Sequence, residues 1–473
     1  MKLRLSVGTY FTSILIFIFF VFALFFSSGN SNLSIPELIG RHNITAKIIY
    51  FIVVFSPLAF FLLSETWKDT FSIPRKILLV GLAAFLASTL YSARYGINAG
   101  ALFLSCSLFF AISQRRIYKP NKVYYWFWGY LLIHIISLIW TTDLHEGLKE
   151  FRVYLLFLTF PLAFCFFKLT GEEIDRLLLL FFRAAIIFVF VSLFCWIYES
   201  SRMGFPLTDW LVFHKKLFAN QFSYAIIFDW VGYDHPSYIS LGYNFAFAVG
   251  IYLLDKRNST CKINIFELTG FALFAFVLTI IIQSRIGLIN FMVIAICGIA
   301  WLLRKQKKYL YGYICLCFLL TAFVLAGTNY ILKFSDDPIR VQQYKTAIYY
   351  IKSNPWFGTG IGGMAKVMTS QELALKLGYP FASVVNIYPS NQFLGDLMQT
   401  GIFGLITLTG MLSFITYYCI KRRNWVLYSL IVSFLILMLI EMPFFLLKGT
   451  TLFVPMTCLL LQMQNMKKGG LID

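Results

Sequence analysis

Arg285 is the residue whose type and position most strongly indicate chemistry. It lies in a very short break between two long apolar stretches, where a charged side chain is costly unless it is functional or paired. An arginine there either acts on a ligand or extends to the interface and contacts lipid headgroups. We expect the first role, because ionisable groups within apolar membrane segments are functional by default.

The segment 328–399 holds a second group of candidates, and it begins with an expected helix over residues 339–352 that carries Arg340 and Tyr344. Asn354-Pro355 should end this helix. An arginine on a solvated helix is ordinary when taken alone, so the case for Arg340 depends on the residues that follow it.

A glycine-rich stretch, with Gly358 and Gly360, comes directly after that helix. It follows a helix and not a strand, and it has no Gly-Lys-Ser/Thr, so a nucleotide-binding loop is excluded. The glycines either allow backbone amides to approach a phosphate or sugar, or they only shape the loop.

The composition indicates the environment in which these residues must be positioned. Of the 473 residues, 59% are hydrophobic and 13% are charged, and Phe alone contributes 52. A water-soluble domain cannot bury so much apolar surface. We therefore expect an all-α polytopic membrane protein with aromatic side chains facing lipid and the bilayer interfaces.

Stretches long enough to cross a bilayer recur along nearly the whole chain. A crossing helix needs about 20 largely apolar residues, and this criterion predicts about fourteen transmembrane helices. The expected spans are 9–27, 46–64, 77–92, 97–113, 123–140, 153–168, 178–198, 236–254, 265–282, 287–304, 309–327, 400–419, 425–442 and 449–463.

Basic residues cluster between alternate pairs of these spans, which is the positive-inside pattern. Clusters such as Arg304-Lys305 and Lys421-Arg422-Arg423 would lie in the cytoplasm together with both termini. The net charge of +19 then reflects membrane topology and not nucleic-acid binding. The nine cysteines fall mostly within apolar spans, and their spacing predicts neither a metal site nor a disulfide framework.

This topology divides the chain into three parts. Residues 1–327 would hold transmembrane helices 1–11, with an outer loop near 199–235. Residues 328–399 would form one large, partly helical extracytoplasmic loop, and residues 400–473 would hold helices 12–14 and a cytoplasmic tail. Long segments on one face are where function is usually found.

Several motifs occur in a fixed order along the chain. They are Trp140-Thr-Thr-Asp143, Asp234-His235-Pro-Ser-Tyr238, Ser284-Arg285-Ile-Gly, Arg340 with Tyr344, Asn354-Pro-Trp-Phe-Gly358-Thr-Gly360, and Ser390-Asn391-Gln-Phe-Leu394 running to Gly401-Ile-Phe-Gly404. In order and context they resemble the O-antigen ligase, polymerase and teichuronic-acid polymerase family of membrane glycosyltransferases. One departure is that Ser390 stands where this family often has His.

The resemblance implies a GT-C-like fold and a metal-independent glycosyltransferase without nucleotide or other cofactor. Its donor would be an undecaprenyl-diphosphate-linked glycan, and its acceptor a glycan or a lipid A core. The enzyme would work at the outer face of the bacterial cytoplasmic (inner) membrane, in contact with membrane lipids. In an O-antigen ligase the acceptor is the lipid A core, and in a polymerase it is another lipid-linked repeat; the sequence leaves both open.

The resemblance also implies roles for individual residues. Arg285 and Arg340 would hold the diphosphate, because the planar guanidinium gives bidentate hydrogen bonds to phosphate oxygens. His235 is the candidate for deprotonating the acceptor hydroxyl, since Ser390 replaces the usual His, although a helix cap is its alternative role. Asn391 would orient the acceptor or the phosphate, or close a turn.

Four further residues would contact the substrate under the same resemblance: Ser390, Tyr344, Gly358 and Gly360. Asp396 and Glu441 are additional polar residues near the bilayer, and either could pair with Arg285 or Lys448.

The main alternative from another class is a flippase or permease for lipid-linked oligosaccharides. A permease should carry polar residues through many spans to line a path. Here most spans are uniformly apolar and the charges gather at their ends, which favours a site at one membrane surface.

Overall fold

The computed structural model describes residues 72–90, 93–202, 235–256, 261, 263–282, 284–303, 338–379 and 388–463. All regular secondary structure in these ranges is helical. The expected spans 9–27, 46–64 and 309–327, and most of the expected outer loop near 199–235, lie outside the described residues.

The chain divides into two compact units, each built from segments far apart in the sequence. Unit 1 comprises residues 1–110 and 172–291, and unit 2 comprises residues 111–171 and 292–473. The described residues of the segment 328–399 belong to unit 2 together with helices that precede and follow them, and the linear division into three parts stays a prediction.

Unit 1 is a group of apolar helices whose ends carry ion pairs. It contains α4 (Ile73–Ser88), most of α5 (Ala93–Gln114), α9 (Gly171–Arg202) from its second residue, α12 (Pro236–Asp255), α13 (Ile265–Ile281) and the first part of α14 (Arg285–Leu303). Arg75 pairs with Glu173 at 2.6 Å, and Lys256 pairs with Asp175 at 2.6 Å. Within the helices, Phe182 packs against Phe271 with ring centroids 5.1 Å apart.

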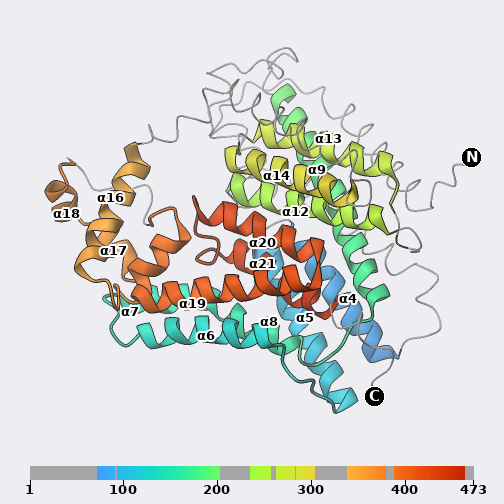
Figure 1. Cartoon of the computed structure of the whole chain (residues 1–473), viewed down its shortest axis with the longest axis horizontal. Helices are drawn as coiled ribbons and strands as arrows, with labels where there is room; N and C mark the ends of the chain where they lie inside the picture. The colour runs from blue at the N-terminus through green and yellow to red at the C-terminus, as the bar shows by residue number, and fades with distance from the viewer. Residues whose placement is uncertain are drawn as a thin grey trace, which may run out of the picture. The chain divides into compact units, whose positions relative to one another are not determined.

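Unit 2 is organised around two long helices that lie side by side, α6 (Lys122–Ser137) and α19 (Gln392–Arg422) (Figure 1). The other helices are α7 (Leu144–Tyr154), α8 (Leu156–Ala163), α16 (Pro338–Ser353), α17 (Met364–Met368), α18 (Gln371–Lys376), α20 (Trp425–Met438) and α21 (Leu447–Gln462). Helices α7, α16 and α17 gather at one end of the α6–α19 pair, on the left of Figure 1.

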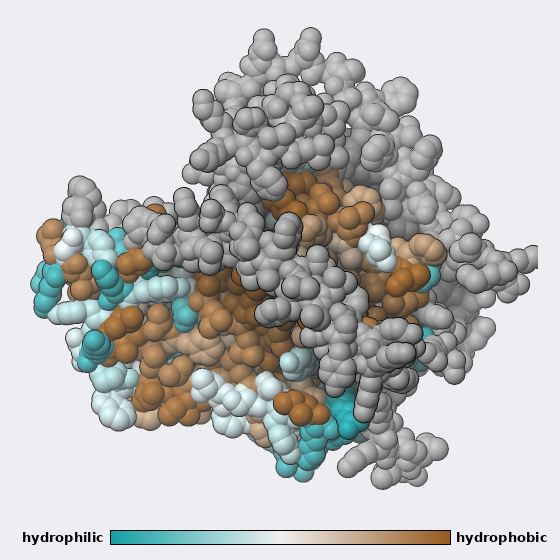
Figure 2. All heavy atoms as spheres, turned by 45° about the horizontal axis from the view of Figure 1, so that its top comes forward, coloured by the Kyte–Doolittle hydropathy of each residue, from teal (hydrophilic) through white to brown (hydrophobic). Residues whose placement is uncertain are grey.

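Several helices have the length and composition of membrane spans, so the chain is a multi-pass membrane protein. Among the described residues these spans are Gly96–Gln114, Gly171–Leu193, Pro236–Asp255, Arg285–Leu303 and Gln392–Arg422. On α19 the apolar side chains of Phe403, Ile406 and Ile420 are exposed, as expected for residues that face lipid. Figure 2 shows hydrophobic side chains along much of this unit, with hydrophilic ones at the end that carries α16 and α18. The total of about fourteen helices stays a prediction.

Two helix boundaries differ from the expected ones for local reasons. The expected span 153–168 is split, because α7 ends at Tyr154 and α8 begins at Leu156. Helix α19 begins at Gln392 and not near residue 400, because the Asn391 side chain accepts a hydrogen bond from the Leu394 amide and caps the helix there. Helix α16 occupies the place expected for 339–352.

Candidate functional site

In unit 1 the structure joins two of the motifs that were identified in the sequence. The Ser240 hydroxyl on α12 lies 3.0 Å from the Ser284 hydroxyl, which directly precedes Arg285. The Asn244 amide donates to the Gly287 carbonyl at 2.8 Å. The stretch that begins at His235 and the stretch that begins at Ser284 therefore lie against each other, and the start of α14 is held against α12.

Gly287 allows this close approach. A Cβ atom placed there would lie 2.5 Å from the Ser240 Cβ and 2.7 Å from the Ser284 Oγ. The Ser284 hydroxyl also accepts a hydrogen bond from the Gly287 amide at 3.1 Å. Small residues at helix interfaces let backbones approach closely in membranes, and here they determine where α14 and its first residue, Arg285, begin.

His235 makes the contacts of a helix cap. Its Nδ1 atom accepts a hydrogen bond from the Ser237 amide at 3.4 Å, in the position that precedes α12. The same Nδ1 atom lies 3.0 Å from the Ser237 hydroxyl, so both of these contacts belong to the cap. The structure thus gives His235 the capping arrangement, and its role as a base stays a prediction.

In unit 2 the predicted residues Tyr344, Ser390 and Asn391 come together where α16 meets the start of α19. The Tyr344 hydroxyl donates to the Ser390 carbonyl at 3.4 Å. The Ser390 hydroxyl donates to the Gln343 side-chain oxygen at 3.1 Å. Asn391 caps α19 and donates from its amide to the Leu439 carbonyl at 2.9 Å. Arg340 lies one helical turn before Tyr344 on α16.

Gln343 is a residue that the sequence analysis missed. Its side chain is fully buried, and its Nε2 group donates to no partner among the described residues. A buried amide donor is normally satisfied, so this group is available to an acceptor on a ligand. Its position three residues after Arg340 in an outer helix was the only signal in the sequence, and many solvated glutamines share that position.

Gly358 and Gly360 approach the protein's own backbone. Both have positive φ angles, +66° and +75°. A Cβ atom at Gly358 would lie 2.5 Å from the Met398 carbonyl oxygen, and one at Gly360 would lie 2.5 Å from the Thr141 Cα. These contacts favour the alternative in which the glycines shape the loop.

A buried carboxylate on α19, Asp396, is held by neutral groups. The Tyr130 hydroxyl lies 3.0 and 3.1 Å from its two oxygens, and the Gln392 amide donates to it at 3.0 Å. Of the pairings with Arg285 or Lys448 that the sequence left open for Asp396 and Glu441, none is described for Asp396, whose described hydrogen bonds come from these neutral donors. Neutral donors can satisfy carboxylate oxygens without bringing a second charge into the apolar region.

A second carboxylate, Glu150 on α7, lies next to the glycine-rich loop. Its Oε2 atom accepts from the Gly362 amide at 3.0 Å and from the Gln399 side chain at 2.5 Å. Burial is the largest cause that raises the pKa of Glu150, to about 8. The sequence analysis missed this residue, because an acidic residue on an amphipathic helix is usually solvated.

Comparison with known families matches residues 270–409 to the family model described as O-antigen ligase. No curated protein matches the chain. The matched stretch contains Arg285, Arg340 and Ser390, and it ends within α19. Over these residues, the chain is similar to the O-antigen ligase family.

Proposed function

We propose that this protein transfers an undecaprenyl-diphosphate-linked glycan to an acceptor at the outer face of the cytoplasmic membrane. The family match over residues 270–409 carries this proposal. In the reaction, an acceptor hydroxyl oxygen attacks the anomeric carbon of the donor. The bond between that carbon and the phosphate oxygen breaks, undecaprenyl diphosphate leaves with the electron pair, and the acceptor proton passes to a base.

Arg285 is the proposed ligand of the leaving diphosphate. Its place at the first position of α14 is set by the contacts of Ser284 and Gly287 with α12. A guanidinium held in this way can present two parallel N–H groups to phosphate oxygens. Arg340 is the proposed second arginine, on the helix that carries Gln343 and Tyr344.

The acceptor distinguishes two versions of this function. An O-antigen ligase would transfer the glycan to a lipid A core, and a polymerase would transfer it to another lipid-linked repeat. Supplying each acceptor separately to the same preparation tests which one is used. A flippase or permease would move the lipid-linked glycan without forming a new glycosidic bond.

The proposal is tested by transfer in liposomes that contain the purified protein, a lipid-linked donor and one acceptor, without added metal or nucleotide. We expect the wild type to form product, and Arg285→Lys to lose on the order of 100-fold in rate. Lysine keeps the charge but not the planar bidentate fork. The matched control is Arg176→Lys, because Arg176 forms an ordinary pair with Glu172 within α9.

Two outcomes would contradict parts of the proposal. If the wild type moves donor across the bilayer without product, the transferase assignment fails. If Arg285→Lys turns over like Arg176→Lys, then Arg285 is an interface anchor and not a diphosphate ligand.

A further inference from the structure

Glu150 differs from the other acidic residues of its helix. Asp143 caps the start of α7, and Glu146 pairs with Lys149 at 2.5 Å. Glu150 has no ion pair among the described residues, and its two hydrogen bonds come from neutral groups. These bonds both end on Oε2, and no described residue donates to Oε1. The two hydrogen bonds to Oε2 thus fix the orientation of the carboxyl group, and Oε1 is available to accept a hydrogen bond from a ligand.

The two groups that orient Glu150 come from the family-matched part of the chain. Gly362 belongs to the glycine-rich loop, and Gln399 belongs to α19. The Tyr154 hydroxyl in turn donates to the Gln399 side-chain oxygen at 3.0 Å, which fixes the amide group of Gln399 with its N–H toward Glu150. Such support from neighbouring groups is what holds a reacting side chain in one orientation.

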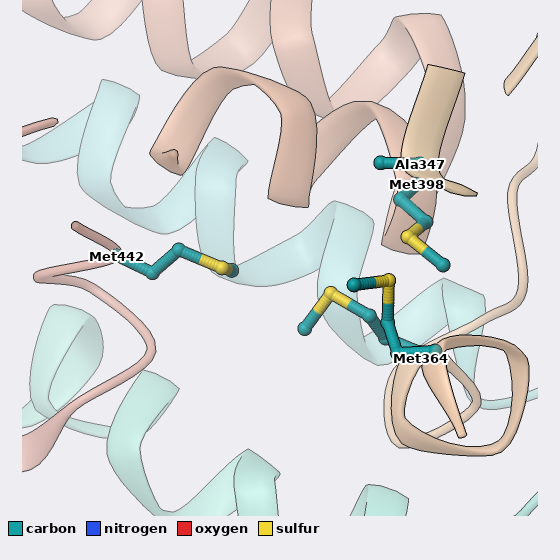
Figure 3. Packing of buried hydrophobic residues seen from close by; sticks show 5 residues of the cluster. Ala347, Met364, Met398 and Met442 are labelled. Carbon is teal, nitrogen blue, oxygen red and sulfur yellow. The ribbon is translucent and has the colours of Figure 1, made fainter. Parts of the chain in front are cut away.

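An apolar cluster includes residues close in sequence to both groups that orient Glu150. It is formed by Ala347, Met364, Met368, Met398 and Met442. Met364 lies two residues after Gly362, and Met398 directly precedes Gln399. Figure 3 shows the side chains of Met364, Met398 and Met442 extending toward a common centre below Ala347. The apolar surroundings account for the raised pKa of Glu150, since burial disfavours the charged form.

The same cluster also includes or contacts residues close in sequence to the predicted substrate residues. Ala347 lies on α16, one turn after Tyr344, and Tyr388 packs against the cluster two residues before Ser390. Burial is the largest cause that raises the pKa of Tyr388, and the negative charges of Glu441 and Glu150 raise it further. Glu150 therefore lies close enough for its charge to act on Tyr388, two residues before Ser390.

Ser390 and His235 are the other candidates for a base, and both have hydrogen-bond partners within their own units. The Ser390 hydroxyl donates to Gln343, and serine is not basic at neutral pH. The Nδ1 lone pair of His235 accepts from the Ser237 amide. A carboxyl group with an oxygen to which no described residue donates, outside the membrane-spanning segments and close enough to act on Tyr388, suits the reaction better.

We propose that Glu150 is the catalytic base of this enzyme, with Oε1 accepting the proton of the acceptor hydroxyl as the new glycosidic bond forms. This inference rests on the proposed transferase function. The balance of the step is complete: the acceptor oxygen bonds to the anomeric carbon, the diphosphate leaves with its electron pair, and Glu150 becomes protonated.

The ionisation of Glu150 gives the reaction a pH dependence. The charged groups around it are Glu146 and Asp143, which raise its pKa further, while the hydrogen bonds from Gly362 and Gln399 lower it. With a pKa of about 8, the carboxyl group is mostly protonated below that pH and becomes an effective base as the pH rises. The turnover rate should therefore increase up to about pH 8 and then level off.

The experiment measures kcat against pH for the wild type, Glu150→Gln and Glu146→Gln in the liposome assay. Glu150→Gln should lower kcat on the order of 100-fold or more and remove the rise toward pH 8. The Glu146→Gln control should keep its activity and still show a rise, shifted to lower pH because the charge of Glu146 raises the pKa of Glu150. Formate should restore part of the activity of Glu150→Ala, because a small carboxylate can occupy the vacated position.

The outcomes separate this inference from the proposed function. If the wild type forms no product, the function fails and the inference with it. If the wild type is active and Glu150→Gln keeps the same rate or the same rise with pH, only the assignment of Glu150 is overturned. If Glu150→Gln does not accumulate in the membrane, the test is whether formate restores activity to Glu150→Ala. If formate restores none, the inference is overturned.

Discussion

At the scale of single residues, the buried carboxyl group of Asp396 in unit 2 is held by neutral hydrogen-bond donors. Asp396 is surrounded by Tyr130 and Gln392, and the Gln392 side-chain oxygen accepts from the Phe444 amide at 2.9 Å. One carboxylate thus helps to connect α6, α19 and the turn before α21. Its hydrogen bonds require an oxygen acceptor, and none of the contacts described for its carboxyl group requires a charge.

Replacing Asp396 tests this interpretation. Asp396→Asn should remain folded, because the amide oxygen accepts from Gln392 and the amide nitrogen can donate to Tyr130. Asp396→Leu should lose stability, by about 1–3 kcal/mol for each buried group left without a partner. Thermal unfolding of the purified proteins in detergent measures the difference, and equal melting temperatures for the two variants would contradict it.

Gly287 offers a second test at this scale. Gly287→Ala should destabilise the α12–α14 contact by about 1–3 kcal/mol, because overpacking a close contact forces the neighbours to move. Gly270→Ala is the matched control, since nothing lies within 4 Å of a Cβ at that position. Combining Gly287→Ala with Ser240→Gly should recover much of the loss in thermal stability, and no recovery would mean that Ser240 is not the limiting contact.

At the scale of elements, α19 is interrupted at Gly401, and another segment of the chain bonds to the backbone groups that lose their helical partners there. Gly401 has φ 66° and ψ −157°, outside the helical region. In an unbroken helix the Ile402 amide would donate to the Met398 carbonyl. Here Ile402 donates to the Pro355 carbonyl at 3.0 Å, and the Met398 carbonyl accepts from the Thr359 amide at 2.8 Å. The turn after α16 therefore supplies a new hydrogen-bond partner to each of the two backbone groups that the break leaves, the Ile402 amide and the Met398 carbonyl.

This arrangement explains why the Asn-Pro-Trp-Phe-Gly-Thr-Gly turn and Gly401 occur together. The Trp140 indole also donates to the Phe357 carbonyl at 2.9 Å, so the loop between α6 and α7 supports the same turn. The turn, the break and α7 form one connected structure, and Glu150 is held within it by Gly362 and Gln399.

Gly401→Ala should disrupt this structure. The positive φ disfavours any residue with a Cβ, and the added atom would lie 2.6 Å from the Phe357 amide nitrogen. We expect a lower melting temperature and faster proteolysis after α16, whereas Gly129→Ala on α6, where no atom lies within 4 Å of the added Cβ, should behave like the wild type. Unchanged proteolysis of Gly401→Ala would show that the turn does not depend on the break.

At the scale of the whole molecule, the two ends of α19 should lie on opposite sides of the membrane. Its first turn contacts α16, and its last turn carries Lys421 and Arg422. The positive-inside pattern places the basic end in the cytoplasm and the α16–α18 end outside.

Cysteine labelling tests this orientation with exposed positions from the structure. Glu372 on α18 and Lys421 on α19 are both exposed. In a background without accessible thiols, Glu372→Cys should react with a membrane-impermeant maleimide in spheroplasts, and Lys421→Cys should react only after the membrane is opened. The reverse pattern would place the proposed site in the cytoplasm and remove the proposed function.

Much of the local structure could be predicted from the sequence. Apolar composition predicted a multi-pass helical membrane protein, and Asn354-Pro355 predicted the end of α16. The ordered motifs predicted the O-antigen ligase-like family that the match over residues 270–409 supports. These features depend on composition, capping and short-range backbone preferences, which neighbouring residues determine.

Only the tertiary structure decided which of these residues meet. It joined Ser240 to Ser284, placed the glycine turn on the break at Gly401, and brought Glu150 to Gln399 across 249 residues of sequence. Hydropathy could not predict these contacts, because lipid is as apolar as the side chains and gives a helix no preference for one apolar neighbour over another. Close packing at small residues and the need to satisfy buried polar groups made that choice.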